Sequence, residues 1–345
     1  MKIAIHHTKG TFSENWIKYC KENEIDYKVV NAYSTDIVRD LGDCDAFMWH
    51  HHHGEIKDIL FAKQLLASLQ ASGKVVFPDT NTGWHFDDKV AQKYLLESIG
   101  APLVPSYVFY TKKDALEWID RTSFPKVFKL RGGAGAVNVK LVINRREARR
   151  FVKKAFNRGF KPSDNWSLFK DRISKWRKGQ ASFMHVVKGV VRLLFPNEIN
   201  RKFHNEKGYA YFQDFMPRNN HDIRICIVDN KAFGIKRLTR DGDFRASGSG
   251  NIIYEKSQID ERCVKIAFNI AKQIKAQSIA LDFIYSPDDK PLIVEISYGF
   301  AKDAYYKCEG YWTDDMKWHE GENFDFCGWM VENVIKEVNS NNKDI

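Results

Sequence analysis

Residues 281–297, LDFIYSPDDKPLIVEIS, decide the fold of this chain because they read as two short strands joined by a tight turn. A four-residue loop pairs Ser286 with Pro291 and thereby places Asp282 directly opposite Glu295. Cross-strand neighbours lie about 5 Å apart, a separation at which two carboxylates can share a divalent cation. The sequence therefore predicts an antiparallel hairpin that carries an acidic pair.

Strand alternation gives this hairpin two different faces. One face holds Asp282, Glu295 and Ser297, whose oxygens suit a hard metal ion. The opposite face is wholly apolar and consists of Leu281, Phe283, Tyr285, Leu292, Val294 and Ile296. A solvated charged face is the alternative for the acidic side, and the rest of the chain has to decide between the two.

The composition predicts a soluble protein of two or three lobes. The chain has 345 residues, 43% of them hydrophobic and 14% aromatic, which is enough for real cores and too long for one ordinary domain. Its six cysteines show no CxxC spacing, which predicts free thiols in a reducing compartment. We find no signal-peptide pattern at the start and no apolar run that could span a bilayer, so we expect a cytoplasmic location.

The net charge of +10 is concentrated in residues 145–207. Nucleic-acid or membrane binding is one explanation for such a surface. The aromatic residues of this segment lack the pattern of any nucleic-acid-binding module. We therefore favour a basic surface for an anionic small substrate, or a merely solvated helix, within an irregular insertion at 161–207.

Residues 1–105 alternate short apolar strands with helices, which predicts an open parallel α/β domain. The strands are KIAIHH, YKVVNA, AFMWHH and KVVFPD, and helices are predicted over 12–23 and 56–73. His50, His51, His52 and His53 follow the third strand, at the edge where such sheets bind ligands. Substrate contact and a solvated loop are both open for these histidines; a structural metal site is disfavoured because neighbouring side chains of an extended segment point apart.

A glycine-rich loop follows the strand that ends in Lys129. The segment FPKVFKLRGGAGAVNVKLV, residues 124–142, reads as strand, loop and strand, with Gly132, Gly133 and Gly135 in the loop. A Rossmann fingerprint or a P-loop needs a helix after the glycines, so neither applies. Bare backbone N–H groups could instead cover phosphates, with Lys129 reaching them from the strand. A plain hairpin turn is the alternative.

Two further segments suit a nucleotide. Strand YFQDFM carries Gln213 and Asp214 beside an exposed backbone edge that suits an adenine base. Asp222, Arg224 and Cys226 then alternate on one face of the next strand. Residues 234–251 hold two arginines that suit a γ-phosphate or an acyl phosphate, Arg237 and Arg245. We expect a helix over 258–277, a loop-like aromatic segment over 298–325 and a closing helix over 326–338.

In this order, the motifs resemble the ATP-grasp superfamily over roughly residues 80–300. The segments DIR and GDFR resemble the ribosomal-protein glutamate-ligase branch, and the tail with EISYGF is similar to ATP-grasp proteins encoded among surface-polysaccharide genes. The resemblance implies an α/β (α+β) ATP-grasp fold with an N-terminal open parallel domain. The expected parts are that domain at 1–105, a central lid domain at 106–208, a C-terminal antiparallel nucleotide- and metal-binding domain at 209–337, and a frayed tail at 338–345.

The resemblance also implies roles for individual residues. Nucleotide binding falls to Lys89, Lys129, Gly132, Gly133, Gly135, Gln213, Asp214 and Met216; metal binding to Asp282, Glu295 and Ser297; and stabilisation of the reacting groups to Arg224, Arg237 and Arg245. The implied cofactors are ATP and two Mg²⁺ ions, with Mn²⁺ as a substitute. Ser297 departs from the family, which usually has Asn there, and this weakens the case for the second metal ion.

The function implied by the resemblance is an ATP-dependent carboxylate–amine ligase that works through an acyl phosphate. A phosphotransferase acting on an anionic small molecule and a non-catalytic ATP-binding regulator are the alternatives. The Tyr- and Trp-rich residues 298–320 directly follow the metal ligands and suggest a sugar-bearing substrate. The identities of the carboxylate and the amine, and the oligomeric state, do not follow from the sequence.

Overall fold

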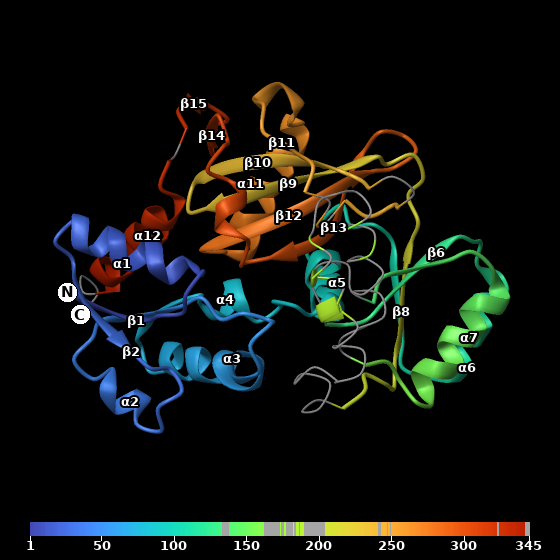
Figure 1. The fold of residues 1–345 in the computed structure, drawn as a ribbon, viewed down its shortest axis with the longest axis horizontal. Coiled ribbons are helices and arrows are strands. Elements are labelled where there is room, and N and C mark those ends of the chain that lie inside the picture. Colours follow the sequence, from blue (N-terminus) through green and yellow to red (C-terminus); the bar gives the residue numbers. More distant parts are fainter. Residues whose placement is uncertain are drawn as a thin grey trace. The chain divides into compact units, whose positions relative to one another are not determined.

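The computed structural model describes residues 1–132, 138–161, 204–240, 243–246, 248, 250–322 and 324–341, together with single positions between 173 and 189. The chain forms two compact units (Figure 1). Unit 1 consists of Met1–Phe86, Leu95–Pro102 and Asn219–Ile345, and unit 2 of Asp87–Tyr94 and Leu103–Arg218.

Unit 1 begins with the predicted parallel sheet. Its strands are β1 (Lys2–His6), β2 (Asp26–Val30), β3 (Ala46–Trp49) and β4 (Val75–Phe77), in the order β2-β1-β3-β4. The helices between them are α1 (Phe12–Glu22), α2 (Ile37–Asp40), α3 (Ile56–Ala71) and α4 (Thr80–Gly83). The two longer helices confirm the sequence prediction, whereas the one-turn helices α2 and α4 are too short to leave a periodic pattern.

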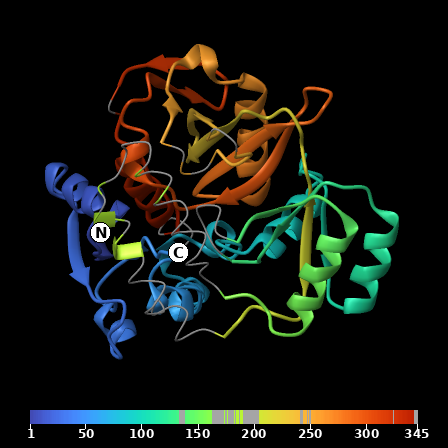
Figure 2. The ribbon, with the colours of Figure 1, turned by 45° about the vertical axis from the view of Figure 1, so that its right-hand side comes forward.

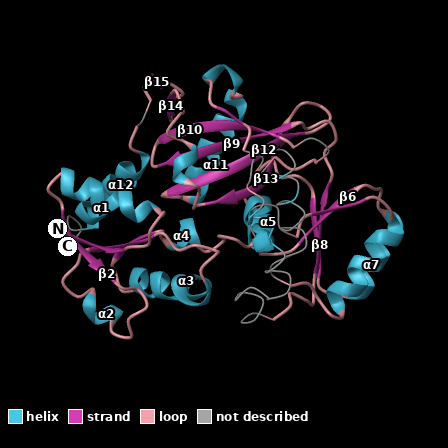
Figure 3. Ribbon diagram, in the orientation of Figure 1, coloured by secondary structure: helices cyan, strands magenta, loops and turns pink. Residues whose placement is uncertain are grey.

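The second sheet of unit 1 is antiparallel and has seven strands, drawn in magenta in Figure 3. They are β9 (His221–Val228), β10 (Lys231–Leu238), β11 (Ile252–Ile253), β12 (Ser278–Tyr285), β13 (Pro291–Ser297), β14 (Gly310–Thr313) and β15 (Trp318–Glu320). The order is β13-β12-β9-β10-β14-β15, and β11 pairs with β10. The short helices η1 (Lys256–Gln258) and η2 (Lys302–Ala304) lie in its connections.

Two long helices complete unit 1. In α11 (Glu261–Ile274), Asp260 caps the first turn, and the buried residues Cys263, Val264, Ala267, Ile270, Ala271 and Ile274 recur at helical spacing. The closing helix α12 (Phe326–Asn341) packs beside α1 (Figure 2). Its Met330 and Val334 share one core with Ile5 of the parallel sheet and Phe233 of the antiparallel sheet. Unit 1 therefore holds both sheets around a common core.

The acidic hairpin forms with a register that differs from the prediction at its turn. Tyr285, not Ser286, pairs with Pro291, so the expected pairing next to the turn is wrong. A β-bulge lies opposite the Asp282–Phe283 step, because Phe283 pairs with Ile293 while Asp282 pairs with Glu295, and Val294 is the extra residue. The extra residue offsets the one-residue shift at the turn, so Asp282 still pairs with Glu295. The predicted opposition of these two residues is confirmed.

The bulge also changes which residues of β13 (Pro291–Ser297) enter the core. Ile293 is fully buried, whereas Leu292 and Val294 are only half-buried. The simple alternation that assigned Leu292 and Val294 to the apolar face is therefore wrong on the turn side of the bulge. An extra residue reverses the facing of every side chain beyond it.

Residues 298–325 are more regular than the expected loop. They contain η2 and the hairpin of β14 and β15, which pairs Tyr311 with His319 and Trp312 with Trp318. Aromatic residues favour strands, and the intervening turn places Met316 at a positive φ of 65°. The prediction of a loop therefore failed because the aromatic residues serve as strand residues at the edge of the sheet.

Unit 2 is built on a four-stranded antiparallel sheet. Its strands are β5 (Ser106–Phe109), β6 (Lys126–Lys129), β7 (Lys140–Val142) and β8 (Ala210–Asp214), in the order β5-β8-β6-β7. The helices α6 (Lys112–Arg121) and α7 (Arg145–Phe156) belong to it, and α5 (Lys89–Ser98) begins in unit 2 and ends in unit 1. The pairing of β6 with β7 confirms the predicted strand–loop–strand around the glycines.

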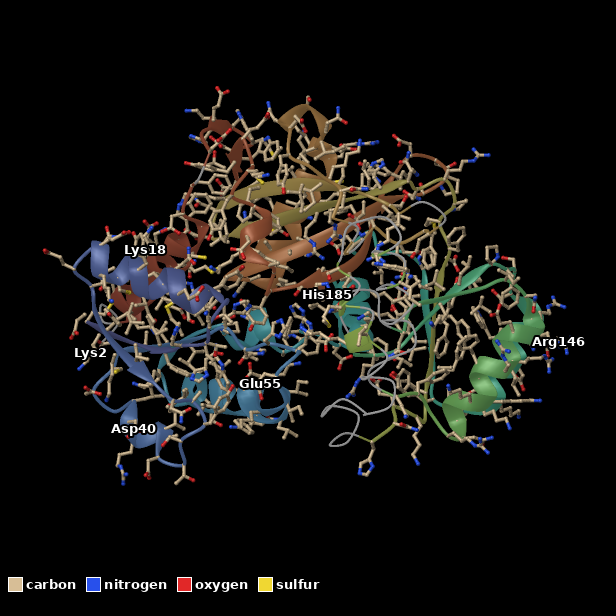
Figure 4. All side chains as sticks on the ribbon, in the orientation of Figure 1. Lys2, Lys18, Asp40, Glu55, Arg146 and His185 are labelled. Atoms are coloured by element: carbon tan, nitrogen blue, oxygen red, sulfur yellow. The ribbon has the colours of Figure 1, made fainter. Side chains whose placement is uncertain are left out.

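Helix α7 accounts for part of the positive charge. Asn144 caps it by accepting from Glu147 N–H, and the Glu147 carboxylate in turn accepts from the N–H of Ile143, the residue before the cap. Ala148, Val152 and Ala155 are buried, whereas the basic residues are solvated, as Arg146 shows in Figure 4. In α7 the positive charge thus lies on a solvated helix face; most of the predicted insertion at 161–207 lies outside the described residues.

The predicted boundaries at 105, 208 and 337 remain predictions of domain organisation, and the two units divide the chain differently. The closing helix continues to Asn341, into the segment where a frayed tail was expected. Among the described residues, no helix combines the length and the apolar character needed to cross a membrane.

Candidate active site

Asp282 lies at the centre of a buried ionic network. Arg224, its direct cross-strand neighbour on β9, donates from Nε to Oδ1 and from Nη2 to Oδ2, the latter at 2.6 Å. Arg237 Nη2 lies 3.0 Å from the same Oδ2. Burial alone would raise the pKa of Asp282, but the two guanidinium groups outweigh it and hold that pKa well below its usual value. Asp282 is therefore ionised at neutral pH.

Asp222 completes this network from β9. Arg237 donates to it from Nε and Nη2, both at 2.7 Å, and the two residues are direct cross-strand neighbours. The two-residue turn Asp229-Asn230 sets that register, since Val228 pairs with Lys231. Counting back from this turn places Asp222 opposite Arg237, a pairing that the sequence analysis did not predict.

Glu295 and Ser297 follow on β13. Glu295 stands opposite Asp282 and Ser297 opposite Ala280. The Ser297 hydroxyl donates to the Gly299 carbonyl at 2.7 Å, which shapes the loop after the strand. A hydroxyl that donates in this way keeps its lone pairs, so Ser297 can still offer an oxygen to a cation.

The predicted magnesium site fits the donor chemistry of this hairpin. Within the described part of the chain, no three His, Cys, Asp or Glu side chains are grouped closely enough to hold a metal ion by themselves. Mg²⁺ is commonly bound by only one or two carboxylates together with phosphate oxygens of the substrate and water. Asp282 and Glu295 provide two such carboxylates in register.

In unit 2, two buried lysines reach across the sheet to β8. Lys129 Nζ donates to Gln213 Oε1 at 2.5 Å, and Gln213 Nε2 donates to Ser106 Oγ at 3.0 Å. Lys126 Nζ pairs with Asp214 at 2.5 Å. The structure thus brings together three residues assigned to the nucleotide, Lys129, Gln213 and Asp214, along adjoining strands.

The start of α5 is tied to the loop after β6. Lys89 N–H donates to the Arg131 carbonyl at 2.9 Å, and the Lys89 side chain is buried. A side chain at Gly132 would approach Asp87 and Glu206 within 3.5–3.6 Å, so this glycine lies close to both carboxylates. Lys89 and Gly132 therefore belong to one local cluster. Gly133 and Gly135 lie outside the described residues.

The remaining candidates are more dispersed. Met216 is half-buried just after β8. Arg245 forms a two-nitrogen ion pair with Asp243, its near neighbour in the chain. This local pairing does not place Arg245 with Arg224 and Arg237, so its catalytic role stays a prediction.

The histidine tract after β3 is largely buried. His50 and His51 are 8% and 3% exposed, so a solvated loop is the wrong interpretation for these two residues. The Tyr298 hydroxyl donates to the His51 carbonyl at 2.6 Å. Asp58 accepts from His52 N–H at 2.6 Å and so anchors the following turn. The tract is held from the loop after β13 and from the first turn of α3.

The aromatic residues after β13 serve mainly as core. Tyr298, Phe300, Tyr305 and Trp312 are each at most 5% exposed. Tyr305 and Phe300 pack against Phe233 with ring centroids 5.3 and 5.9 Å away. Buried rings cannot stack on a sugar, so these four residues of the segment 298–320 give no support to the predicted sugar-bearing substrate.

Comparison with known proteins agrees with this architecture. Residues 200–305 match the family model of the RimK-like ATP-grasp domain. The fold resembles that of a RimK domain ATP-grasp protein from Sphaerobacter thermophilus, with a TM-score of 0.57 and 13% identity over 97% of this chain and 100% of that one. The chain has the ATP-grasp fold. The fold that the sequence resemblance implies is thereby confirmed.

Other ATP-grasp structures are similar over most of their length. D-alanine–D-alanine ligase from Bacillus anthracis, complexed with ATP, gives a TM-score of 0.57 and 13% identity over 100% of this chain and 99% of that chain. N5-carboxyaminoimidazole ribonucleotide synthetase from Thermotoga maritima gives a TM-score of 0.52 and 13% identity, over 86% of this chain and 67% of that chain. No curated protein matches the sequence. At these identities the likeness establishes the fold.

The buried histidines of this ATP-grasp chain predict a stability that falls in acid. Burial, with a smaller contribution from nearby Lys63, lowers the pKa of His51 to about 3 and that of His85 to about 4. Histidines of the unfolded chain titrate near 6.5, so between these values the unfolded state binds more protons. The free energy of unfolding should therefore decrease as the pH falls below 6.5.

Urea unfolding between pH 6.5 and pH 5 checks this against a His51→Leu variant. Removing one buried imidazole should make the pH dependence of the unfolding free energy shallower by about 1.4 kcal/mol per pH unit. Identical slopes for the two proteins would show that His51 is protonated in the folded state.

Proposed function

We propose that the chain is an ATP-dependent carboxylate–amine ligase. The observation that carries the proposal is the opposition of Asp282 and Glu295 within the segment that matches the RimK-like ATP-grasp family. Structures of the same fold include a D-cycloserine synthetase and a D-alanine–D-alanine ligase, and the latter is named for joining two amino acids. We extend this type of chemistry to the present chain.

The reaction has two balanced steps. An oxygen of the substrate carboxylate attacks the γ-phosphorus of ATP, and the bond to the β-phosphate oxygen breaks, giving an acyl phosphate and ADP. A neutral amine then attacks the acyl carbon, the amide forms, a proton leaves the nitrogen, and phosphate departs. No covalent bond to the protein is needed, so the protein acts by positioning and by charge stabilisation.

The residues divide between these tasks. Lys89 and Lys129 would contact the ATP phosphates, and Gln213, Asp214 and Met216 would line the adenine site. Asp282 and Glu295, with Ser297, would hold Mg²⁺, which when bound neutralises charge on the phosphates. Arg224 and Arg237 keep Asp282 anionic through their direct ion pairs. Arg245 remains our candidate for stabilising the transferred phosphoryl group.

The substrate and the compartment are finer proposals. A sugar-bearing carboxylate, as in surface-polysaccharide synthesis, remains a candidate on the resemblance of the tail alone. All six cysteines lie in described residues and are free thiols, which suits the reducing, ATP-containing cytoplasm. We therefore propose that the reaction takes place there.

A single assay separates the ligase from its alternatives. ADP release is measured with a panel of uronic acids, amino acids and simple carboxylates, each with and without an amine. A ligase releases ADP and phosphate and forms an amide only when both substrates are present. A phosphotransferase makes ADP and a stable phosphorylated product without an amine, and a regulator binds ATP without turnover; either outcome would overturn the proposal.

Lys129 gives a prediction about the nucleotide. Lys129→Met should weaken ATP binding by about 1.5–3 kcal/mol, because it removes a charge-assisted hydrogen bond to phosphate. Titration calorimetry of the full chain measures the change. Lys113→Met, which alters an exposed lysine of α6 in the same unit, is the control and should bind like the wild type. Equal ATP affinity of all three proteins would show that Lys129 does not contact the phosphates. The glycine-rich loop would then be a simple turn.

A further inference from the structure

His50 is fixed in position by two contacts with Phe12. It directly follows β3, and only 8% of the residue is exposed. Its ring stacks on Phe12 with centroids 3.9 Å apart and an angle of 14°. Its Nδ1 accepts the backbone N–H of Phe12, the first residue of α1, at 3.0 Å. Packing and this hydrogen bond together leave the imidazole a single orientation.

The Phe12 contact also fixes the tautomer of His50. A backbone N–H only donates, so Nδ1 must carry the lone pair. Burial, and then the neighbouring histidines, lower the pKa of His50 well below its usual value, so the ring is neutral near pH 7. A neutral imidazole with a free lone pair on Nδ1 has its proton on Nε2. His50 therefore presents an N–H donor at Nε2.

The His50 ring also connects the first turn of α1 to the proposed ligand, because it accepts a backbone N–H of that turn. The next two amides of the first turn are used internally, since Ser13 N–H donates to Thr11 Oγ1 and Glu14 N–H to the Thr11 carbonyl. Only the Phe12 N–H points outward, into His50. Hydrogen bonds in series polarise one another, so the partial positive charge at the helix start strengthens the Nε2–H group as a donor.

The donor faces the loop that follows the acidic hairpin. The position that a Cβ would take on Gly299 lies 3.1 Å from His50 Nε2, so any larger residue there would crowd this nitrogen. Ser297 and Tyr298 hold the loop in place through the Gly299 carbonyl and the His51 carbonyl. In the described parts of the chain, His50 Nε2 has no hydrogen-bond partner. It is a preorganised donor beside Gly299, which lies four residues beyond Glu295 in the chain.

We propose that His50 Nε2–H binds an anionic oxygen of the substrate, from a carboxylate or a phosphate group, beside Gly299. This deepens the proposed ligase function and rests on it. A group that only donates requires an acceptor, so the ammonium form of an amine is excluded from this position. A neutral donor of fixed tautomer also loses no strength as the pH crosses 6.5. The glycine at 299 keeps the approach to the nitrogen open.

Three matched variants test His50 as a binding residue. His50→Asn keeps an acceptor for the Phe12 N–H but lacks the distal donor. His50→Gln keeps an amide N–H near the position of Nε2. His52→Asn is the control, because His52 Nδ1 likewise accepts a backbone N–H, from Gly54 at 3.0 Å, on an exposed residue.

For each variant we would measure the Michaelis constant for the most active carboxylate of the ADP-release panel. The melting temperature of the same variant shows whether it is folded. In His50→Asn the constant should rise about tenfold or more, as for one charge-assisted hydrogen bond. His50→Gln should recover part of this loss, and His52→Asn should match the wild type. A wild-type constant in folded His50→Asn, or an equal rise in His52→Asn, would overturn the proposal.

A second measurement does not depend on turnover. Two-bond ¹H–¹⁵N spectra of the histidine-labelled full chain, with ADP and Mg²⁺, identify His50 by its loss in His50→Gln and report its tautomer. Adding acetate or inorganic phosphate should shift the Nε2 signal, and the stronger of the two identifies the source of the oxygen; methylammonium should not shift it. An Nδ1–H tautomer, or no shift with either anion, would refute the inference even if the ligase activity is found.

Discussion

Replacing Glu295 with alanine should abolish ATP turnover and leave the chain folded. Glu295 stands opposite Asp282 and is half-buried, while the core side of the hairpin is made by Leu281, Ile293 and Ile296, which the change does not touch. Losing one of the two carboxylates would remove half of the negative charge that the proposed site offers to Mg²⁺. ADP release should fall by several orders of magnitude, with the circular dichroism spectrum and the melting temperature close to those of the wild type.

Asp288→Ala is the matched control for this change. Asp288 is an exposed carboxylate in the turn of the same hairpin, so its loss lowers the charge equally without touching the pair. It should turn over ATP at the wild-type rate. Turnover by Glu295→Ala within a fewfold of the wild type would remove Glu295 from the proposed metal site.

Replacing Arg237 with methionine should lower the free energy of unfolding more than any other substitution proposed for this chain. The change leaves Asp222 without its two-nitrogen partner and removes one of the two cations that compensate Asp282, and both carboxylates are buried. Breaking a buried ion pair from one side costs about 3–5 kcal/mol, because it leaves an uncompensated charge in the interior. Urea unfolding at pH 7 measures the loss.

Arg262→Met provides the comparison at the surface. Arg262 also pairs with two carboxylates, Asp260 and Asp289, but half of its side chain is exposed. Exposed pairs contribute about 0–1 kcal/mol, so this variant should remain near the wild-type stability. Similar losses for the two variants would mean that water reaches the network around Asp282.

The alternating pattern of strands and helices was enough to predict the architecture of unit 1. Local sequence patterns indicate the apolar strands β1, β3 and β4 and the capped, periodic helices α1 and α11. Such local preferences usually agree with the final fold. The edge hairpin of β14 and β15 was missed, because its Tyr- and Trp-rich residues lie among Gly and Asp and read as a loop. Strand β14 is fixed by its pairing with β10, and β15 by its pairing with β14, neither of which sequence periodicity reveals.

The opposition of Asp282 and Glu295 was predicted with a wrong turn register. The bulge at Val294 restores the pairing, and nothing in the sequence of a hairpin states that an extra residue will be accommodated there. Only the pairing beyond the bulge was correct, and it is the pairing that the proposed site depends on.

The ion pairs around Asp282 could not be predicted from the sequence of any one strand. Asp222 and Arg224 were recognised on one face of β9, but their partners come from β10 and β12. Cross-strand partners follow from the order of the strands in the sheet, and that order is a property of the whole fold. The burial of His50 and His51 depends in the same way on Phe12 and Tyr298, which lie far from them in the sequence.

The path of oxygen tests the acyl-phosphate chemistry most directly. With a carboxylate substrate that releases ADP only together with an amine, both carboxylate oxygens are labelled with ¹⁸O, and the released phosphate is examined by mass spectrometry. The proposed reaction transfers one carboxylate oxygen to phosphorus, so each phosphate formed should carry one ¹⁸O for each amide made. Unlabelled phosphate formed alongside the amide, or label retained in a stable phosphorylated product without an amide, would contradict the ligase mechanism.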